Sequence, residues 1–155
     1  MIQRIQSLYL LLATALTVVC MSNCIGFFIS EDGEVLGKLY NLFFTDAREG
    51  ASAQFTPWAL FVILLISSTL TFLNIFLYKH RALQMRVCSF CMILLAGWYA
   101  AYAAFAWFIT GMFEADSFRV GLWASLPCVS LILLYLAFRS ILKDEKLVRS
   151  LDRLR

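Results

Sequence analysis

Residues 87–113 read VCSFCMILLAGWYAAYAAFAWFITGMF, and this stretch contains no charged side chain. At about 1.5 Å of rise per residue, a helix of this length crosses the roughly 30 Å hydrocarbon core of a bilayer. Three further windows are also free of charge, namely residues 5–30, 51–78 and 120–138. The chain is therefore expected to lie almost entirely in a membrane.

The composition supports the same conclusion and limits the number of domains. The chain of 155 residues is 62% hydrophobic and 15% charged, whereas a soluble domain carries about 25% charged residues. Little sequence remains outside the apolar windows, so we expect one all-α integral membrane domain over residues 1–155. The expected spans are residues 5–28, 57–78, 87–113 and 119–140, followed by a cytoplasmic tail at residues 141–155.

The basic residues are unevenly distributed among the segments that join these windows. Ten of the 13 lysines and arginines lie at residues 1–4, 79–86 and 139–155, whereas seven of the ten acids lie at residues 31–50 and 114–119. Short segments rich in Lys and Arg stay on the cytoplasmic side of a membrane. We therefore expect an antiparallel four-helix transmembrane bundle with both termini in the cytoplasm and the two acidic loops outside.

Local signals indicate where the helices begin and end. The first window is longer than the apolar core of a usual signal peptide and shows no obvious cleavage site, so we expect a retained signal anchor. Thr56 can cap the second helix, with Pro57 in its first turn. Pro127 lies inside the expected fourth helix and should kink it, because its ring clashes with the carbonyl of Trp123.

The segments outside the membrane are short, and two of them carry structural signals. Asp32 and Gly33 lie between apolar runs and favour a small hairpin in the outer loop, although residues 35–44 are as compatible with an interfacial helix. Residues 141–155 place apolar and basic side chains on opposite faces of a helix. This amphipathic C-terminal tail should continue the fourth helix or lie on the cytoplasmic leaflet.

Two stripes of side chains suggest how the helices pack. Ser67, Thr71 and Asn74 share one face of the second helix, where they either form interhelical hydrogen bonds or line a transport path. Packing is favoured, because the middle of every window lacks the ionisable groups that proton-coupled transporters use. The second stripe is a ridge of small residues that a neighbouring helix can approach closely, made by Ala96, Ala100 and Ala104.

The sequence Cys88-Ser89-Phe90-Cys91 has the spacing of a redox or metal-binding motif. In a thioredoxin-like context this spacing activates the first thiol, and two thiols at the start of a helix can bind a metal. Membrane oxidases that regenerate disulfide catalysts use cysteines on the oxidising side, whereas Arg86 places this pair on the reducing, cytoplasmic side. We therefore expect buried packing residues, with no metal or cofactor site.

The remaining cysteines and the single histidine give weaker signals. Cys20 and Cys24 lie towards the oxidising side, but four-residue spacing within a continuous helix suits packing better than a disulfide. A helix that ended near Asn23 would remove this objection. His80 has no partner with which to form a catalytic group, so no catalytic residue is expected.

Three segments resemble one bacterial family across the whole length of the chain. They are MIQRIQSLYLLL at residues 1–12, NIFLYKHRALQMRVC at residues 74–88 and KDEKLVRSLDRLR at residues 143–155. Through these segments the chain resembles the four-span membrane proteins catalogued as domain of unknown function 4293. The resemblance implies four spans in a bacterial inner membrane and no particular activity. It also implies that the position of Cys91 is often polar, which disfavours a redox pair.

All three segments lie on the expected cytoplasmic side, so we expect the protein to act there. The favoured hypothesis is a non-enzymatic accessory or assembly factor that contacts a protein partner or anionic lipid. The alternatives are a thiol-disulfide oxidoreductase that uses paired cysteines and a small transporter or channel subunit. The net charge of +3 does not indicate a nucleic-acid partner, and the oligomeric state stays open. The residues expected to contact the partner or lipid are Arg4, Lys79, Arg81, Arg86, Lys146, Arg149, Arg153 and Arg155.

Overall fold

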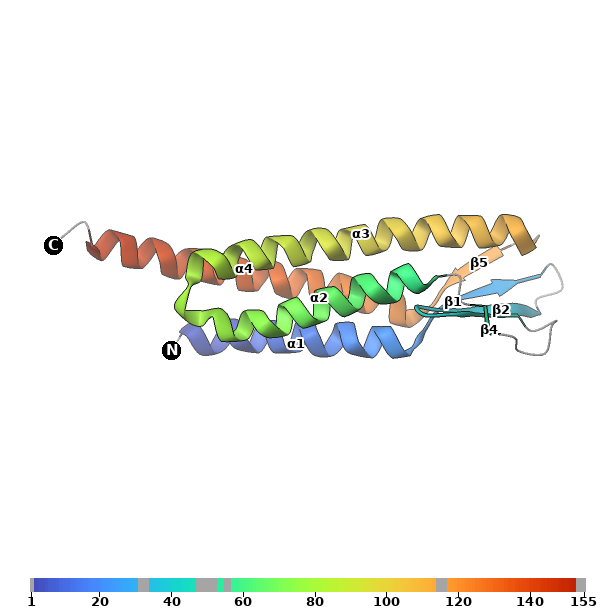
Figure 1. The fold of residues 1–155 in the computed structure, drawn as a ribbon, viewed down its shortest axis with the longest axis horizontal. Helices are drawn as coiled ribbons and strands as arrows, with labels where there is room; N and C mark the ends of the chain where they lie inside the picture. The colour runs from blue at the N-terminus through green and yellow to red at the C-terminus, as the bar shows by residue number, and fades with distance from the viewer. Residues whose placement is uncertain (1, 31–33, 47–52, 55–56, 114–116, 153–155) are drawn as a thin grey trace.

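In the computed structural model, four long helices form an elongated bundle with a small sheet at one end (Figure 1). The structure describes residues 2–30, 34–46, 53–54, 57–113 and 117–152. The helices are α1 (Ile2–Ser22), α2 (Trp58–Phe76), α3 (Arg81–Phe113) and α4 (Leu126–Asp152). Two short 3-10 helices, η1 (Leu77–Lys79) and η2 (Leu122–Ser125), precede α3 and α4.

Each long helix contains a segment that is long and apolar enough to cross a membrane. These segments are Ile5–Ser22, Trp58–Phe76, Arg81–Gly111 and Leu122–Lys146. A helix satisfies its own backbone hydrogen bonds, which an isolated segment in hydrocarbon must do. The length and composition of these four helices therefore make the protein a multi-pass membrane protein.

Successive helices run in opposite directions, and each packs against two others (Figure 1). Helix α1 contacts α2 and α4, and α3 contacts the same two helices from the other side. We name the end that holds the start of α1, η1 and α4 beyond Arg139 the terminal end, and the opposite end the sheet end. Helix α4 extends past the other helices at the terminal end.

A single pattern of buried positions runs along every helix. The buried residues of α3 alternate at steps of four and three, at Gln84, Cys88, Cys91, Leu95, Trp98 and Tyr102. The other three helices repeat this alternation, which is the seam of a left-handed helical bundle. Cys88, Cys91 and the stripe of Ser67, Thr71 and Asn74 all occupy seam positions. Their spacing is therefore the spacing of the bundle core.

The alanine ridge of α3 is not part of this seam. Ala96, Ala100 and Ala104 are exposed, so the expectation that a neighbouring helix of the chain approaches them was wrong. The reason is that Leu95 and Trp98 occupy the interior on the adjacent face, where Trp98 donates a hydrogen bond to Asn41 and large side chains gain packing contacts.

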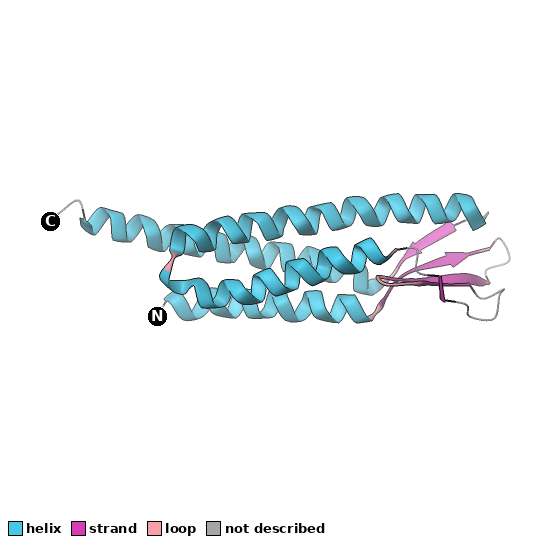
Figure 2. Cartoon of the chain, in the orientation of Figure 1, coloured by secondary structure: helices cyan, strands magenta, loops and turns pink. Residues whose placement is uncertain are grey.

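The chain is not all-α, which corrects the expected fold class. An antiparallel sheet at the sheet end has the strand order β4-β3-β2-β1-β5 (Figure 2). Its strands are β1 (Cys24–Ile29), β2 (Val35–Tyr40), β3 (Phe44–Asp46), β4 (Ala53–Gln54) and β5 (Ser117–Val120). Strand β1 lies between β2, its partner in a hairpin, and β5, which comes from the loop before α4. The loop between α1 and α2 and the loop between α3 and α4 therefore build one sheet.

The sheet shortens two of the expected spans. Helix α1 ends at Ser22 rather than near Phe28, because residues 24–29 pair as a strand. Helix α4 begins at Leu126 rather than at residue 119, because residues 117–120 pair with β1. The hairpin was one of the two alternatives for the outer loop and is confirmed, whereas its expected turn at Asp32 and Gly33 lies outside the described residues.

Neither proline interrupts a helix. Pro57 is the residue before the first turn of α2, and Thr56, the expected cap, lies outside the described residues. Pro127 is the second residue of α4, so the expected kink was wrong. In the first turn of a helix the backbone nitrogen has no carbonyl partner, and the missing N–H of proline costs nothing there.

The sheet is fastened to the bundle by side chains that reach the backbone of the connecting segments. Trp98 Nε1 donates to Asn41 Oδ1 at 3.1 Å, and Asn41 Nδ2 donates to the carbonyl of Cys20 at 2.8 Å. The hydroxyl of Tyr102 donates to the carbonyl of Ile25 at 2.7 Å. Helix α3 thus holds the end of α1, the start of β1 and the segment after β2 in one arrangement.

Aromatic rings fill the space between α3 and the sheet. The ring of Phe28 contacts Phe44 at a centroid distance of 5.5 Å and Phe118 at 4.8 Å. Phe118 in turn contacts Tyr102, which stacks on Trp98 at 5.3 Å. Ring pairs of this kind stabilise a core beyond the area that they bury, so the sheet end has a hydrophobic core of its own.

Candidate interaction surface at the terminal end

A buried polar contact joins α1 to α4 at the terminal end. Gln6 Nε2 donates to Asp144 Oδ2 at 2.6 Å and lies 3.5 Å from Ser140 Oγ. Gln6 and Asp144 are both buried. A buried carboxylate without a partner is costly, so this contact fixes the position of α4 where it continues beyond the apolar window. Neither residue was among the expected site residues.

A second polar contact locks the turn between α2 and α3. Asn74 Nδ2 donates to the carbonyl of Gln84 at 3.3 Å and lies 3.1 Å from Cys88 Sγ. Gln84 Nε2 donates to the carbonyl of Asn74 at 3.2 Å. The three side chains are buried. The segment 74–88, one of the three that carried the family resemblance, therefore closes on itself across the turn.

The cysteine pair of α3 faces α2 and has no path to solvent. Cys88 and Cys91 are fully buried, which confirms their expected burial. Cys91 Sγ lies 4.0 Å from the carbonyl of Ser67. The side-chain oxygens Ser67 Oγ and Asn74 Oδ1 have no hydrogen-bond partner among the described residues. This seam packs thiols against small polar groups.

Cys20 and Cys24 lie on opposite sides of the helix end at Ser22, so they do not share a continuous helix. All five cysteines lie within the described part of the chain, and all five are free thiols. Cys24 Sγ donates to the carbonyl of Gly26 at 3.2 Å. Burial raises the pKa of the Cys24 thiol above its ordinary value, which lowers the fraction of reactive thiolate at neutral pH.

The structure describes the side chains of three of the eight basic residues expected to contact a partner. Arg86 and Lys146 are exposed, and Arg81 is half-buried. Arg4, Lys79 and Arg149 belong to α1, η1 and α4, and their side chains lie outside the described part. Arg153 and Arg155 lie outside the described residues. The structure therefore tests the expected surface only at the start of α3 and on α4.

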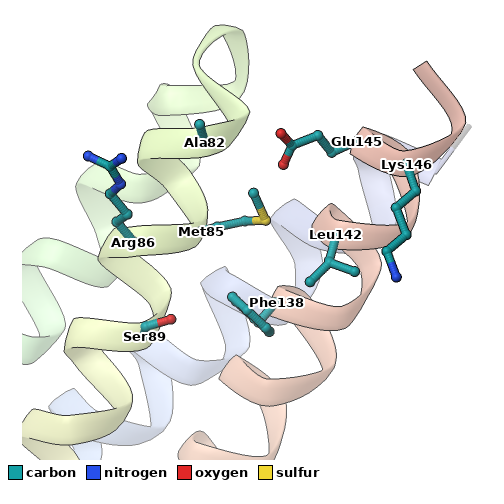
Figure 3. Close-up of a pocket in the computed structure, with 8 residues that line it drawn as sticks. All are labelled: Ala82, Met85, Arg86, Ser89, Phe138, Leu142, Glu145 and Lys146. Carbon is teal, nitrogen blue, oxygen red and sulfur yellow. The ribbon is translucent and has the colours of Figure 1, made fainter. Parts of the chain in front are cut away.

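A groove of about 450 Å³ separates the start of α3 from α4 (Figure 3). Met85, Phe138 and Leu142 give it an apolar floor, and Figure 3 shows the carboxylate of Glu145 directed towards α3. The guanidinium of Arg86 points away from α4, whereas the side chain of Lys146 extends back along α4. The groove thus has cations at its two rims and an acid between them.

A second hollow of about 410 Å³ lies beside the first on α4. Its lining residues, so far as the structure describes the chain, include no acid. Leu142 and Lys146 belong to both hollows. Two cations of this hollow, Arg139 and Lys143, were not among the expected site residues, although their four-residue spacing was visible in the sequence. The lining residues are Arg139, Ser140, Leu142, Lys143 and Lys146.

These features define a multi-pass membrane protein with four candidate spans, a sheet at one end and a polar, basic surface at the other. The family model described as Domain of unknown function (DUF4293) matches residues 2–154, and the chain belongs to this family. None of the curated proteins compared with the chain matches it. The match confirms the resemblance carried by the three segments. Those segments supply Gln6, Asn74, Gln84 and Asp144 to the contacts at the terminal end.

Proposed function

We propose that this protein is a non-enzymatic accessory or assembly factor of the bacterial inner membrane. It acts through the basic surface of the terminal end, where it contacts a protein partner or anionic lipid. The observation that carries the proposal is the hollow lined by Arg139, Lys143 and Lys146. These cations lie on α4. The buried contact between Gln6 and Asp144 fixes the position of α4 against α1.

The distribution of charged and aromatic side chains supports a cytoplasmic position for this surface. Trp58 and Trp107 are 59% and 86% exposed at or towards the sheet end, and exposed Trp is typical of a membrane–water interface. Along α3, the rise from Arg86 to Trp107 is about 31 Å at 1.5 Å per residue. This matches the thickness of the hydrocarbon core. The basic terminal end then faces the cytoplasm under the positive-inside rule.

The packing of the seam supports a structural role for the residues that the two alternative functions would use. An oxidoreductase would need an accessible thiol pair, whereas Cys88 and Cys91 are fully buried against α2. A transport path would need Thr71 and Asn74 to face a channel, whereas both are buried in the same helix contact. No specific observation in the structure favours the oxidoreductase or the transporter alternative.

Crosslinking in cells tests the proposal. A photo-crosslinking residue at Leu142, which lines both hollows, should capture a defined protein or lipid. The matched control places the same residue at Leu122, which is exposed at the sheet end. Mass spectrometry of the adducts should show different products at the two positions. Identical adducts at both positions, or none at Leu142, would contradict the proposal.

A charge variant adds a second test of the same surface. Deleting residues 143–155 would also delete Asp144 and its contact with Gln6, so a loss of function would be ambiguous. Replacing Arg149, Arg153 and Arg155 by Gln keeps that contact. This variant should weaken the Leu142 adducts and reduce co-purification of the partner. Unchanged adducts, co-purification and phenotype would remove the tail from the proposed surface.

A further inference from the structure

One exposed face of α4 changes its chemistry at residue 139. Six residues at steps of three and four occupy this face, which we name the α4 stripe, within an arc of about 100° on a helix. The first three are apolar and 40–53% exposed, and the last three are exposed cations. The α4 stripe consists of Val129, Ile132, Leu136, Arg139, Lys143 and Lys146.

The acids of this part of α4 are turned away from the α4 stripe. Asp144 is buried and accepts a hydrogen bond from Gln6. Glu145 lies in the groove towards α3, as Figure 3 shows. The hollow on the stripe is lined by its three cations, together with Ser140 and Leu142. No acid of the described part of α4 lines this hollow, so the charged groups that line it are all positive.

The change in chemistry coincides with the expected edge of the membrane. Residue 139 directly follows the charge-free window at 120–138. The apolar half of the stripe therefore faces acyl chains, and the cationic half lies at the level of the headgroups of the adjacent leaflet. Lys and Arg place their aliphatic stems along apolar surface and their charges in the headgroup layer. A ligand that fits both halves must be apolar at one end and anionic at the other.

We propose that the α4 stripe binds one anionic phospholipid. The phosphate lies among Arg139, Lys143 and Lys146, and an acyl chain follows Ile132 and Leu136. This inference rests on the proposed function, because it names the ligand of the same terminal-end surface. A soluble protein partner fits less well, since it would not enter the hydrocarbon layer that the apolar half occupies. The positive charge of one half of the stripe and the position of the other half in the hydrocarbon layer together favour the lipid.

Native mass spectrometry of the full-length protein tests this directly. Phosphatidylglycerol and phosphatidylcholine are added separately, and the ratio of the two affinities is the readout. The wild type should prefer phosphatidylglycerol by tenfold or more. Replacing Lys143 and Lys146 by Gln should lower the ratio about fivefold for each charge removed. Soluble glycerol phosphate should not displace the lipid, because it lacks acyl chains.

Two variants with the same change of net charge control for diffuse attraction. Lys38→Gln with Arg119→Gln removes two exposed charges at the sheet end and should leave the ratio unchanged. Arg81→Gln with Arg86→Gln removes two charges at the terminal end but off the stripe, and should lower the ratio less than the stripe variant. An equal loss in this second variant, or displacement by glycerol phosphate, would overturn the lipid site.

The outcomes separate this inference from the proposed function. A protein adduct at Leu142, combined with no preference for phosphatidylglycerol, would retain the interaction surface and reject the lipid. A preference that survives in the Lys143→Gln, Lys146→Gln variant would also reject the stripe as the site. Absence of any adduct at Leu142 in cells would instead contradict the proposed function, whatever the purified protein binds.

Discussion

The two ends of the bundle are held together by different chemistry. At the terminal end, helices are joined by buried polar side chains, as between Gln6 and Asp144. At the sheet end, aromatic rings fill the interior and side chains of α3 bond to the backbone of the loops, as Tyr102 does to Ile25. The difference shows that the sheet end is held by an aromatic core, whereas the terminal end is held by buried polar contacts between helices.

The lengths of the connections explain this difference. At the terminal end, η1 (Leu77–Lys79) joins α2 to α3 and leaves no room for further structure. At the sheet end, the loops between α1 and α2 and between α3 and α4 are long enough to form strands. Backbone groups near the membrane surface must find hydrogen-bond partners. Strand pairing supplies those partners, and the aromatic side chains cover the sheet.

The largest effect is expected at the sheet end, from Trp98→Ala. Trp98 is fully buried, donates to Asn41 and stacks on Tyr102. Truncating a buried Trp costs about 3–5 kcal/mol of unfolding free energy. Thermal or denaturant unfolding of the purified protein measures this loss. Trp107→Ala, which removes an 86% exposed side chain, is the matched control and should change stability little. Similar losses of stability in both variants would show that the sheet end has no hydrophobic core of its own.

A smaller loss is expected where β1 meets the start of η2. The nitrogen of Gly121 donates to the carbonyl of Ile25 at 2.8 Å. A Cβ at residue 121 would lie 2.8 Å from the carbonyl carbon of Ile25 and 2.9 Å from the carbonyl oxygen of Cys24. Because backbone cannot move aside cheaply, Gly121→Ala should destabilise the protein by about 1–3 kcal/mol.

Gly97→Ala is the control for this substitution, and the expected change has the opposite sign. Apart from neighbouring residues and the backbone of α3 itself, no atom lies within 4 Å of a Cβ at residue 97. Alanine favours a helix over glycine by about 0.5–1 kcal/mol. Gly97→Ala should therefore raise the free energy of unfolding, whereas Gly121→Ala should lower it. If Gly121→Ala were neutral, the close approach of η2 to β1 would not hold the sheet in place.

An effect smaller than that of Trp98→Ala is expected at the terminal end, in a double-mutant cycle of Gln6→Ala and Asp144→Ala. Their side chains contact each other directly, so the cycle isolates one contact. A hydrogen bond to a carboxylate contributes about 1.5–3 kcal/mol. The unfolding free energies of the two single variants and the double variant give the coupling energy. A coupling energy near zero would mean that α1 and α4 are positioned by apolar packing alone.

The same kind of cycle can be performed at the sheet end with Trp98→Ala and Asn41→Ala, because the two side chains form a hydrogen bond between neutral groups. Comparing the two cycles shows whether the ends differ in their polar contacts or only in their aromatic packing. Equal coupling energies would assign the whole difference between the ends to the aromatic rings.

The sequence predicted the spans well where the tertiary contacts agree with the apolar pattern. Residues 57–78 and 87–113 were expected to be helical, and α2 and α3 cover most of them. The expectation failed at residues 24–29 and 117–120. A short apolar run next to a helix has the same hydrophobic pattern whether it continues the helix or pairs as a strand. The pairing of β1 with β2, and with β5, which is distant in the sequence, decided between them.

The candidate surface was predictable in part. The basic flanks follow from counting charges, and Arg86 and Lys146 were expected site residues that are exposed. Arg139 and Lys143 were overlooked as site residues, although their spacing with Lys146 places all three on one face of a helix. The contact of Asp144 with Gln6 could also not be predicted, since the two residues are 138 positions apart in the chain.

The sequence by itself determined that this chain forms four apolar helices and which segments between them are basic. Hydrophobic transfer and the cost of burying charge depend on local composition, so they can be evaluated window by window. The tertiary structure decided that the outer loops form one sheet and that the cysteine pair belongs to the bundle seam. It also decided that Asp144 of α4 is buried against α1, whereas Arg139, Lys143 and Lys146 are exposed. These features depend on which distant segments meet, and no window of the sequence contains that information.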